Sequence, residues 1–504
     1  MAGELKLQTP SRRLVLISNR LPISLSRANG KWQITSSSGG LVTAMGPVLR
    51  NRGGMWIGWP GTVDSPGMGR LMDAQQEKFG FSLAPVMLTQ EEQENFYFGF
   101  SNKIIWPLFH GLQSLCDYNP AYWTAYEVVN LKFAHIILEN SSSDDYIWIH
   151  DYHLMSSAKY LRGLGMKSPI GFFLHIPFPP PDIFHKLPWR TQILEGLLEF
   201  DLLGFQTSRH KRNFMHAVRT MLPELRPVGK GQISRIPLGG REVRVGHFPI
   251  GIDYKSFSIN AASPEVEHQV IGLHDAFPGC TKILGVDRLD YTKGLPYKLD
   301  GFRNALQNYP ELRRKVTLIQ VVVPSREDIP EYHALKAEIE RLVGQINGQF
   351  ADPGWLPIHY TFRSLKRDEL LAYYRACEVA LVTPLEDGMN LVAKEYCACS
   401  EPDGGVLILS EFAGAAAQLR GSAIIVNPYD LEGVAAAINE ACMMDASSRS
   451  SRMRKLQRAI KDQDIFWWVD SFLQAGISSE LEDYPMLLQA RQGQVDDSWW
   501  WESV

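Results

Sequence analysis

Two cations, Arg288 and Lys293, stand five residues apart in the stretch GVDRLDYTKGLPYKL (285–299). An apolar run precedes them and a helical pattern follows, so we expect both in a tight loop before a helix. A guanidinium forks onto two phosphate oxygens, an ammonium acts as a point charge, and helix-start amides add partial positive charge. This spacing therefore fits a diphosphate. Composition alone favours the alternative, a solvated loop in which Arg288 pairs with Asp287 or Asp290.

A second stretch, PLEDGMNLVAKEY (384–396), follows the apolar run VALVT. Gly388 would let a backbone approach a ligand closely, because no side chain stands in the way. Four amides at the expected helix start could bind hydroxyls or a phosphate, those of Gly388, Met389, Asn390 and Leu391. Glu395 could accept hydrogen bonds from vicinal hydroxyls, as acids do with ribose. The alternative is a capped helix, with Asp387 at the N-cap and Glu395 on the exposed face, although Asp387 could do both.

Three histidines follow apolar runs in HDYHLM (150–155) and HIPFP (175–179), namely His150, His153 and His175. Metal binding is one interpretation, but neither H-E-x-x-H nor H-x-x-E-H is present, which favours core or hydroxyl-binding histidines. The stretch SNRLP (18–22) could form an anion pocket with Lys103 and Arg326 on the other side of a cleft.

The strands that must position these residues are indicated by short, continuous apolar runs. These are LVLIS (14–18), YIWI (146–149), GFFL (171–174), LLGFQ (202–206), ILGV (283–286), TLIQVVV (317–323), VALVT (379–383), VLIL (406–409) and AIIV (423–426). Continuous runs are typical of strands buried on both faces, and segments that read as helices separate them. The pattern predicts an α/β, doubly wound architecture. Seven runs are followed by polar residues rich in Arg, His and Asp, and ligands bind at the carboxyl ends of such strands.

Size and composition set further bounds. A chain of 504 residues is too long for one compact core, and FPIGIDYKSF (248–257) has the pattern of a crossover between two domains. A net charge of −4 gives no indication of nucleic-acid or membrane-surface binding. The six cysteines have no zinc spacing, and no apolar signal segment or membrane-length run is present, so we expect a cytoplasmic protein. Dinucleotide-binding, P-loop and nucleophile-elbow motifs are also missing from the sequence.

The chain resembles the trehalose-6-phosphate synthase family, retaining glycosyltransferases of the two-Rossmann-domain GT-B type. The resemblance rests on motifs in family order between residues 13 and 475: SNRLP, SSGGLV, WIGWPG, FSNKIIWPLFH, IWIHDYHLM, GFFLHIPFP, DLLGFQT, FPIGID, GVDRLDYTKGLP, VPSRED, INGQF, EDGMNLVAKEY, LSEFAGAA and IIVNPYD. It implies two Rossmann-like domains with the active site in the cleft between them. It also outweighs the alternatives that composition alone favours.

The resemblance implies three segments. Residues 1–247 would form the acceptor domain, for glucose 6-phosphate, and residues 248–465 the nucleotide-sugar domain. Residues 466–504 would form a helix that crosses back to the first domain, followed by a tail. The tryptophan-rich end of that tail lies outside the resemblance and is either a docking segment or disordered.

For the donor, the resemblance implies that Arg288 and Lys293 grip the diphosphate and that Glu395 binds the ribose. Asp387 and the amides of residues 388–391 would hold the glucose and the diphosphate end, with Gly40 also at the donor and His175 reaching the sugar from the other domain. The catalytic set is then Arg288, Lys293, His175 and Asp387.

For the acceptor, the resemblance implies that Arg20, Tyr97 and Arg326 bind the phosphate. Trp59 and Trp106 would wall the pocket, and Asp151 would bind a sugar hydroxyl. The pyranose-sized pocket favours glucose 6-phosphate.

The implied reaction transfers glucose from UDP-glucose to glucose 6-phosphate with retention, by front-face displacement in which the leaving phosphate takes the acceptor proton. Cations and helix amides would stabilise the leaving UDP, so we expect neither a metal nor a cofactor. Two alternatives remain: a related synthase that uses another acceptor such as glycerol 3-phosphate, and a non-catalytic regulatory homologue.

Two residues depart from the family pattern. Phe98 stands beside Tyr97 where many relatives have a polar residue, and Glu386 precedes Asp387 where relatives often have Arg. We also expect a homo-oligomer, a dimer or tetramer. Because the chain carries no phosphatase domain, a separate trehalose-6-phosphate phosphatase would act downstream.

Overall fold

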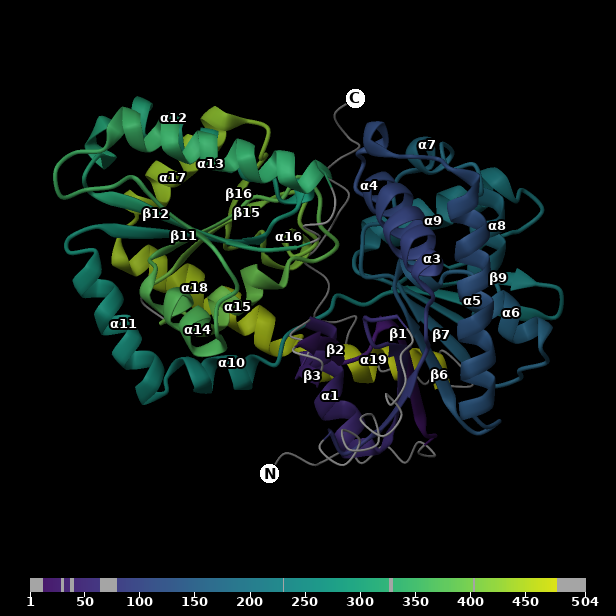
Figure 1. Ribbon diagram of the computed structural model, residues 1–504. Helices are drawn as coiled ribbons and strands as arrows, with labels where there is room; N and C mark the ends of the chain where they lie inside the picture. The colour runs from purple at the N-terminus through teal and green to yellow at the C-terminus, as the bar shows by residue number, and fades with distance from the viewer. Residues whose placement is uncertain are drawn as a thin grey trace. The chain divides into compact units, whose positions relative to one another are not determined.

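The computed structural model describes residues 12–28, 31–36, 40–63, 79–229, 231–325, 330–401 and 404–477. The chain divides into two compact units (Figure 1). The first holds the described residues up to Phe248 together with those from Val469 onward, and the second is Pro249–Trp468.

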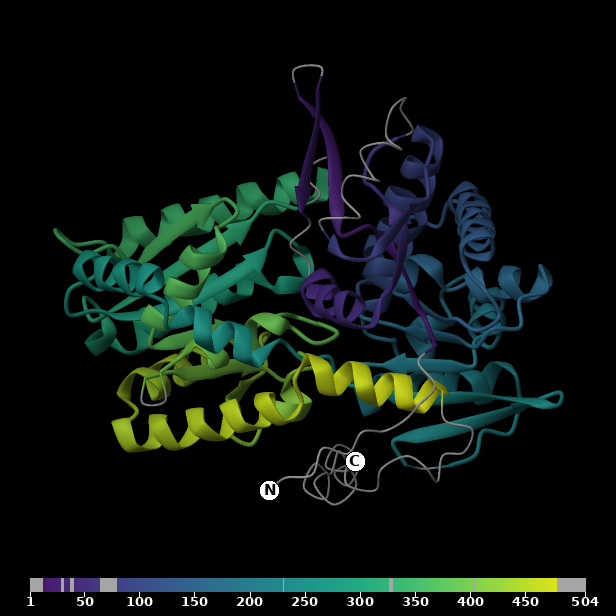
Figure 2. The ribbon, with the colours of Figure 1, turned by 90° about the horizontal axis from the view of Figure 1, so that it is seen from below.

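The first unit is built on an eight-stranded sheet. Its strand order is β5 (Ser82–Pro85), β4 (Gly54–Trp59), β1 (Leu14–Arg20), β6 (Tyr146–His150), β7 (Ile170–Phe173), β8 (Leu202–Phe205), β10 (Arg241–His247) and β9 (Ile233–Leu238). All neighbours pair in parallel except β10 and β9, an antiparallel pair at one edge (Figure 2). The remaining strands of the unit, β2 (Ile23–Ala28) and β3 (Lys31–Ser36), form a separate antiparallel hairpin.

The helices of this unit include a π-helical segment, Gln93–Ile105, which carries Tyr97 and leads directly into α4 (Trp106–Phe109). The others are α1 (Gly40–Arg52), α3 (Gln90–Glu92), α5 (Pro120–Asn140), α6 (Ser157–Gly163), α7 (Pro181–Phe184), α8 (Arg190–Leu197) and α9 (Ser208–Met221). Short 3₁₀ turns occupy Gln113–Leu115 and Tyr152–Leu154. π-Helical segments are rare and are often found at functional sites, and the segment Gln93–Ile105 carries a predicted acceptor residue, Tyr97.

The second unit contains a six-stranded sheet in which every neighbouring pair is parallel. Its order is β13 (Ile358–Phe362), β12 (Val316–Val323), β11 (Thr281–Arg288), β14 (Val379–Val382), β15 (Val406–Ser410) and β16 (Ile424–Val426). In Figure 1, α12 (Leu295–Asn308), α13 (Pro330–Phe350) and α17 (Leu431–Met443) cover one face. The opposite face is covered by α11 (Pro264–Ala276), α14 (Arg367–Ala376), α15 (Leu391–Cys399) and α18 (Ala446–Asp462).

Shorter elements complete this unit: α10 (Tyr254–Ala261), α16 (Ala416–Leu419), and the 3₁₀ turns Tyr291–Lys293 and Pro310–Leu312. The prediction of two doubly wound α/β domains is confirmed, and all nine apolar runs supply strands. Their side chains are buried because helices cover both faces; for example, all five residues of β6 and seven of the eight in β12 are buried.

The last described helix, α19 (Ile465–Ile477), has residues in both units. The amide of Ile465 donates to the carbonyl of Ile252, 3.0 Å away, in the second unit. In the first unit, Phe472 stacks on Trp148 with ring centroids 4.4 Å apart and also contacts Phe248. Among the described residues, no helix is both long and apolar enough to cross a membrane.

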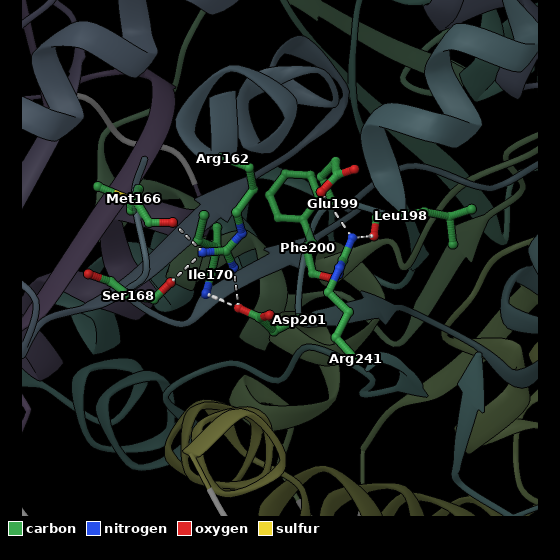
Figure 3. A network of polar contacts seen from close by, with 9 residues as sticks. All are labelled: Arg162, Met166, Ser168, Ile170, Leu198, Glu199, Phe200, Asp201 and Arg241. Atoms are coloured by element: carbon green, nitrogen blue, oxygen red, sulfur yellow. Dashed lines mark hydrogen bonds and ion pairs between the residues drawn. The ribbon is translucent and has the colours of Figure 1, made fainter. Parts of the chain in front are cut away.

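A polar network in the first unit fastens the segments that lead into β7, β8 and β10 (Figure 3). Asp201 accepts from Arg162 and from the amide of Ile170, each at 2.7 Å. Arg241 donates to the carbonyl of Leu198 and to the carboxylate of Glu199. These contacts lie at the amino ends of β7 and β8, so they stabilise the edge of the sheet opposite the strand ends where ligands bind in such folds.

Candidate functional site

Each sheet has a switch point, the position at which the order of its strands reverses. In the second unit the order reverses between β11 and β14, and in the first between β1 and β6. Ligands of open α/β sheets bind outside the carboxyl ends of the strands at such points. Arg288 ends β11, Asp387 follows β14, Arg20 ends β1 and Asp151 follows β6. The predicted site residues therefore gather at these two positions.

Arg288 is exposed at the carboxyl end of β11, and its side chain forms no ion pair with any residue that the structure describes. Asp287 is buried instead and accepts from Lys298, at 2.5 Å, and from Gln320, at 3.0 Å. Asp290 accepts from the amide and hydroxyl of Thr292. The alternative structural pair between Arg288 and an aspartate is therefore wrong, and the guanidinium remains available for an anion.

Lys293 and Asp387 meet across the switch point of the second sheet. The ammonium of Lys293 lies 2.5 Å from Oδ2 of Asp387, and their side chains are 11% and 15% exposed. The same oxygen accepts from the side-chain amide of Asn390 at 3.2 Å. Because both side chains still reach solvent, the ammonium of Lys293 can exchange its contact with Asp387 for one with an anionic ligand.

The loop before α15 differs from the prediction in one respect. Asn390, not Asp387, is the N-cap, and its side chain accepts from the amide of Ala393. Asn390 has a φ of 68°, a conformation that Asn tolerates better than most residues. Gly388 and Met389 therefore lie before the helix, and their amides and that of Asn390 donate to no described residue. Leu391 begins the helix, so its amide has no partner within it either.

Glu395 is half-buried, which contradicts the alternative that placed it on the exposed face. Its Oε2 accepts from the hydroxyl of Tyr374 at 2.8 Å. Burial raises the pKa of Glu395, and the hydrogen bond from Tyr374 acts in the opposite direction. The second oxygen of the carboxylate leaves further acceptor capacity for hydroxyl groups.

Sequence reasoning assigned no role to the segment that supports this loop, FAGAA (412–416). The amide of Gly414 donates to the carbonyl of Asp387 at 3.0 Å, and that of Ala415 donates to the carbonyl of Met389 at 2.8 Å. A Cβ at position 414 would lie 1.9 Å from the carbonyl oxygen of Gly388. Only glycine permits this approach, so the glycine in LSEFAGAA was the signal available in the sequence.

In the first unit, Arg20 lies with its guanidinium carbon 4.6 Å from the centroid of the Trp59 ring. Burial lowers the pKa of Arg20, and the neighbouring Tyr97 acts against this shift. Gly61 makes room for the guanidinium, because a Cβ there would lie 2.0 Å from one of its nitrogens. The packing against Trp59 and the space at Gly61 fix the orientation of the Arg20 guanidinium at the end of β1.

An aromatic row joins the other residues predicted for the acceptor. Ring centroids lie 5.6 Å apart for Trp59 and Tyr97 and 5.9 Å apart for Tyr97 and His153. The row continues from His153 to Tyr152 at 3.9 Å and from Tyr152 to Trp106 at 5.8 Å. Phe98, the departure from the family pattern, lies against Tyr97 at 5.2 Å. The structure thus brings Trp59, Tyr97 and Trp106 into one wall, which includes His153.

Asp151 follows β6 with a φ of 74°, which is strained for a residue other than glycine. Its Oδ1 accepts from the amide of His175 at 3.2 Å. Nδ1 of His150 lies 3.1 Å from Nε2 of His175, so one ring donates and the other accepts. Burial lowers the pKa of His175 to about 3 and that of His150 well below its usual value. Both rings are therefore neutral at pH 7.

For two of the predicted site residues, Gly40 and Arg326, the structure gives no contact that bears on the predicted role. Gly40 is the first residue of α1, and Arg326 lies outside the described residues. Lys103, proposed for an anion pocket, has its ammonium 5.8 Å from the centroid of the Tyr122 ring. Over the described part of the chain, no three His, Cys, Asp or Glu side chains are grouped so that they could hold a metal ion. That no metal takes part stays a prediction.

Comparison with known proteins relates this chain to one family of enzymes. The model of glycosyltransferase family 20 matches residues 12–476. A trehalose-6-phosphate synthase of Mycobacterium sp. (strain JLS) is 42% identical over 94% of this chain and 98% of its own. An α,α-trehalose-phosphate synthase (UDP-forming) from Burkholderia xenovorans, solved with glucose-6-phosphate, is 34% identical with a TM-score of 0.82, covering 92% of this chain and 99% of its own. A structure from E. coli bound with UDP-2-fluoro glucose is 35% identical with a TM-score of 0.83, covering 93% and 99%.

Proposed function

The chain belongs to glycosyltransferase family 20, and on that premise we propose that it is a retaining glucosyltransferase that makes α,α-trehalose 6-phosphate and UDP from UDP-glucose and glucose 6-phosphate. The observation that carries the proposal is the switch point of the second sheet. There an exposed arginine, a lysine and three amides that donate to no described residue meet at the ends of β11 and β14.

In the proposed reaction, Arg288 and Lys293 stabilise the negative charge that builds on the departing UDP. Lys293 exchanges part of its contact with Asp387 for a phosphate oxygen, which leaves Asp387 an acceptor for a hydroxyl of the donor glucose. The amides of residues 388–391 add donors at the same place, and Glu395 accepts from the ribose hydroxyls. These groups supply the charge compensation that other transferases obtain from a metal.

For the acceptor, we propose that Arg20 binds the phosphate of glucose 6-phosphate and that the wall of Trp59, Tyr97 and Trp106 shapes the sugar pocket. Asp151 would hold a hydroxyl of the sugar and His175 would contact the donor glucose. Arg326 is assigned to the phosphate by resemblance alone. The acceptor proton would pass to the leaving phosphate, so no base among the side chains is required for front-face displacement.

We also carry forward four further expectations. The first unit would bind the acceptor and the second the nucleotide sugar. The chain would act in the cytoplasm. It would also form a homo-oligomer, and size-exclusion chromatography with light scattering would test the oligomeric state. A separate phosphatase would remove the phosphate of the product.

The decisive experiment measures nucleoside diphosphate release from UDP-, GDP- and ADP-glucose, with and without glucose 6-phosphate, and identifies the product by NMR. We expect release from UDP-glucose that depends on the acceptor and yields an α,α-1,1 linkage. If only glycerol 3-phosphate supported release, the acceptor assignment would be wrong. If no donor reacted with either acceptor, the regulatory alternative would replace the enzyme.

A further inference from the structure

An open pocket of about 660 Å³ lies on the second unit, away from the switch point. One side of it is formed by Arg420–Ala423, which directly precede β16, and the other by residues of α18. Because all strands of this sheet are parallel, the amino end of β16 lies at the opposite edge from the carboxyl ends of β11 and β14. The pocket is therefore separate from the proposed donor site.

The lining of this pocket has the chemistry of an anion site. It contains three cations, Arg420, Arg452 and Lys455, together with four serines, and neither a carboxylate nor an aromatic ring. Arg420 and Lys455 form no ion pair with any described residue, whereas Arg452 has an oxygen of Glu440 at 3.8 Å. Several cations without a carboxylate favour a phosphoryl group, and the lack of a ring disfavours a nucleotide base.

The hydroxyl groups narrow the ligand further. Ser448 is already engaged, because its amide and hydroxyl both donate to Asp445, the N-cap of α18. The helix start is thus satisfied by its own cap, and the pocket depends on side chains instead. Ser447 and Ser451 are exposed there and make no side-chain hydrogen bond with a described residue. Hydroxyls beside cations suit a ligand that carries both phosphate oxygens and hydroxyl groups.

A short helix links this pocket to the loop at the donor site. Arg420 is the C-cap of α16, at the end that lines the pocket. At the other end of α16, Gly414 and Ala415 donate to the carbonyls of Asp387 and Met389. Gln418, in the middle of α16, donates to the carbonyl of Ala459 on α18 at 2.9 Å. A ligand that draws Arg420 toward α18 would therefore act on a helix that also holds the donor loop.

We propose that this pocket is an effector site that binds the phosphoryl group of a phosphorylated sugar and alters the donor loop through α16. The binding part stands by itself, while the effect on the donor rests on the proposed function. Inorganic pyrophosphate is a suitable probe for binding, because it supplies the oxygens without a sugar.

The test of binding is calorimetric titration of pyrophosphate into the full chain saturated with UDP and glucose 6-phosphate, so that the proposed substrate sites are filled. The variant Arg420→Ala/Lys455→Ala removes the two cations that form no ion pair with a described residue. The control, Arg458→Ala/Lys461→Ala, removes the same charge from exposed positions of α18 outside the pocket. We expect the pocket variant to bind at least about tenfold more weakly than the wild type and the control. Equal affinity in all three proteins, or no binding to the wild type, would overturn the site.

The test of coupling is the rate of UDP release at subsaturating UDP-glucose, with and without a hexose bisphosphate. We expect the rate to change by at least about twofold in the wild type and the control and to stay constant in the pocket variant. If calorimetry showed binding but the rate of the wild type did not change, the effector role would be wrong. If no rate could be measured in any protein, the proposed function would fail while the binding result still decided the pocket.

Discussion

The switch points of the two sheets occupy the same place in similar folds, but their side chains differ in charge and burial. Each has a residue other than glycine with a positive φ on the segment that follows a central strand, Asp151 directly after β6 and Asn390 at the start of the helix after β14. In the second unit this position is polar and charged, with Lys293 held on Asp387 and Arg288 exposed. In the first unit it is occupied by a neutral histidine pair, the buried His150 and the half-buried His175. The second unit therefore offers charges that can change partners, and the first offers a shaped, desolvated surface with Arg20 as its cation.

The largest effect should follow from removing charge at the second switch point. Arg288→Ala should nearly abolish turnover, because a charge-assisted contact to the leaving diphosphate is lost, at a cost of about 2–5 kcal/mol. Steady-state kcat for UDP release measures this. The control is Arg341→Ala, which removes an exposed arginine of the same unit whose side chain donates a hydrogen bond to Gln345. Near-normal turnover in Arg288→Ala with an intact fold would refute the diphosphate role.

The next effect concerns shape at the first switch point. Gly61→Ala should raise the KM for glucose 6-phosphate about tenfold with a smaller change in kcat, because its Cβ would displace the guanidinium of Arg20. Gly111→Ala is a matched control: its φ of +74° is similar to the +87° of Gly61, but a Cβ there meets nothing within 4 Å. If both variants raised the acceptor KM equally, backbone strain would explain the effect and Arg20 would lose its assigned role.

The sequence predicted the strands much better than it predicted these contacts. Continuous apolar runs mark strands covered on both faces, and each of the nine runs proved to be one. The missed strands are those that lack such runs, including β4, GMWIGW, with its two glycines, and the antiparallel β9 and β10, which alternate buried and less buried residues. The long π-helical segment has no periodic signature in the sequence that distinguishes it from an α-helix.

The position of a candidate residue was predictable where one motif contained both the residue and the strand end, as for Arg288 and Lys293. It was not predictable where distant residues meet. Tyr374 reaches Glu395 across 21 positions of the chain, and Gly61 accommodates Arg20 from another strand end. The sequence placed the N-cap of this helix at Asp387, whereas the structure has it at Asn390. Both residues are good N-caps, and only the backbone conformation decides between them.

A smaller effect should test how the second unit places its carboxylate. Tyr374→Phe removes the hydroxyl that donates to Glu395 and should weaken UDP binding about fivefold, a loss of about 1 kcal/mol. Tyr360→Phe is the control, since that hydroxyl is buried without a hydrogen-bond partner among the described residues. The wild type should also prefer UDP over 2′-deoxy-UDP more strongly than Tyr374→Phe does. An unchanged preference would show that Glu395 does not bind the ribose through this arrangement.

An effect on stability rather than on catalysis should appear in the pH dependence of the first unit. The pKa of His175 in the folded chain is about 3, and that of His150 is also well below the ordinary value of 6.5, because burial disfavours the charged rings. Between these values the unfolded chain binds more protons than the folded one, so the free energy of unfolding falls as the pH drops below 6.5. Each histidine contributes at most about 1.4 kcal/mol per pH unit. Denaturant unfolding at pH 7 and pH 5 should therefore show a smaller loss for His150→Asn than for the wild type, whatever the stability of the variant at pH 7. An equal loss in both proteins would mean that the pair is already charged or solvated in the folded chain, and the contrast between a neutral and a charged switch point would not hold.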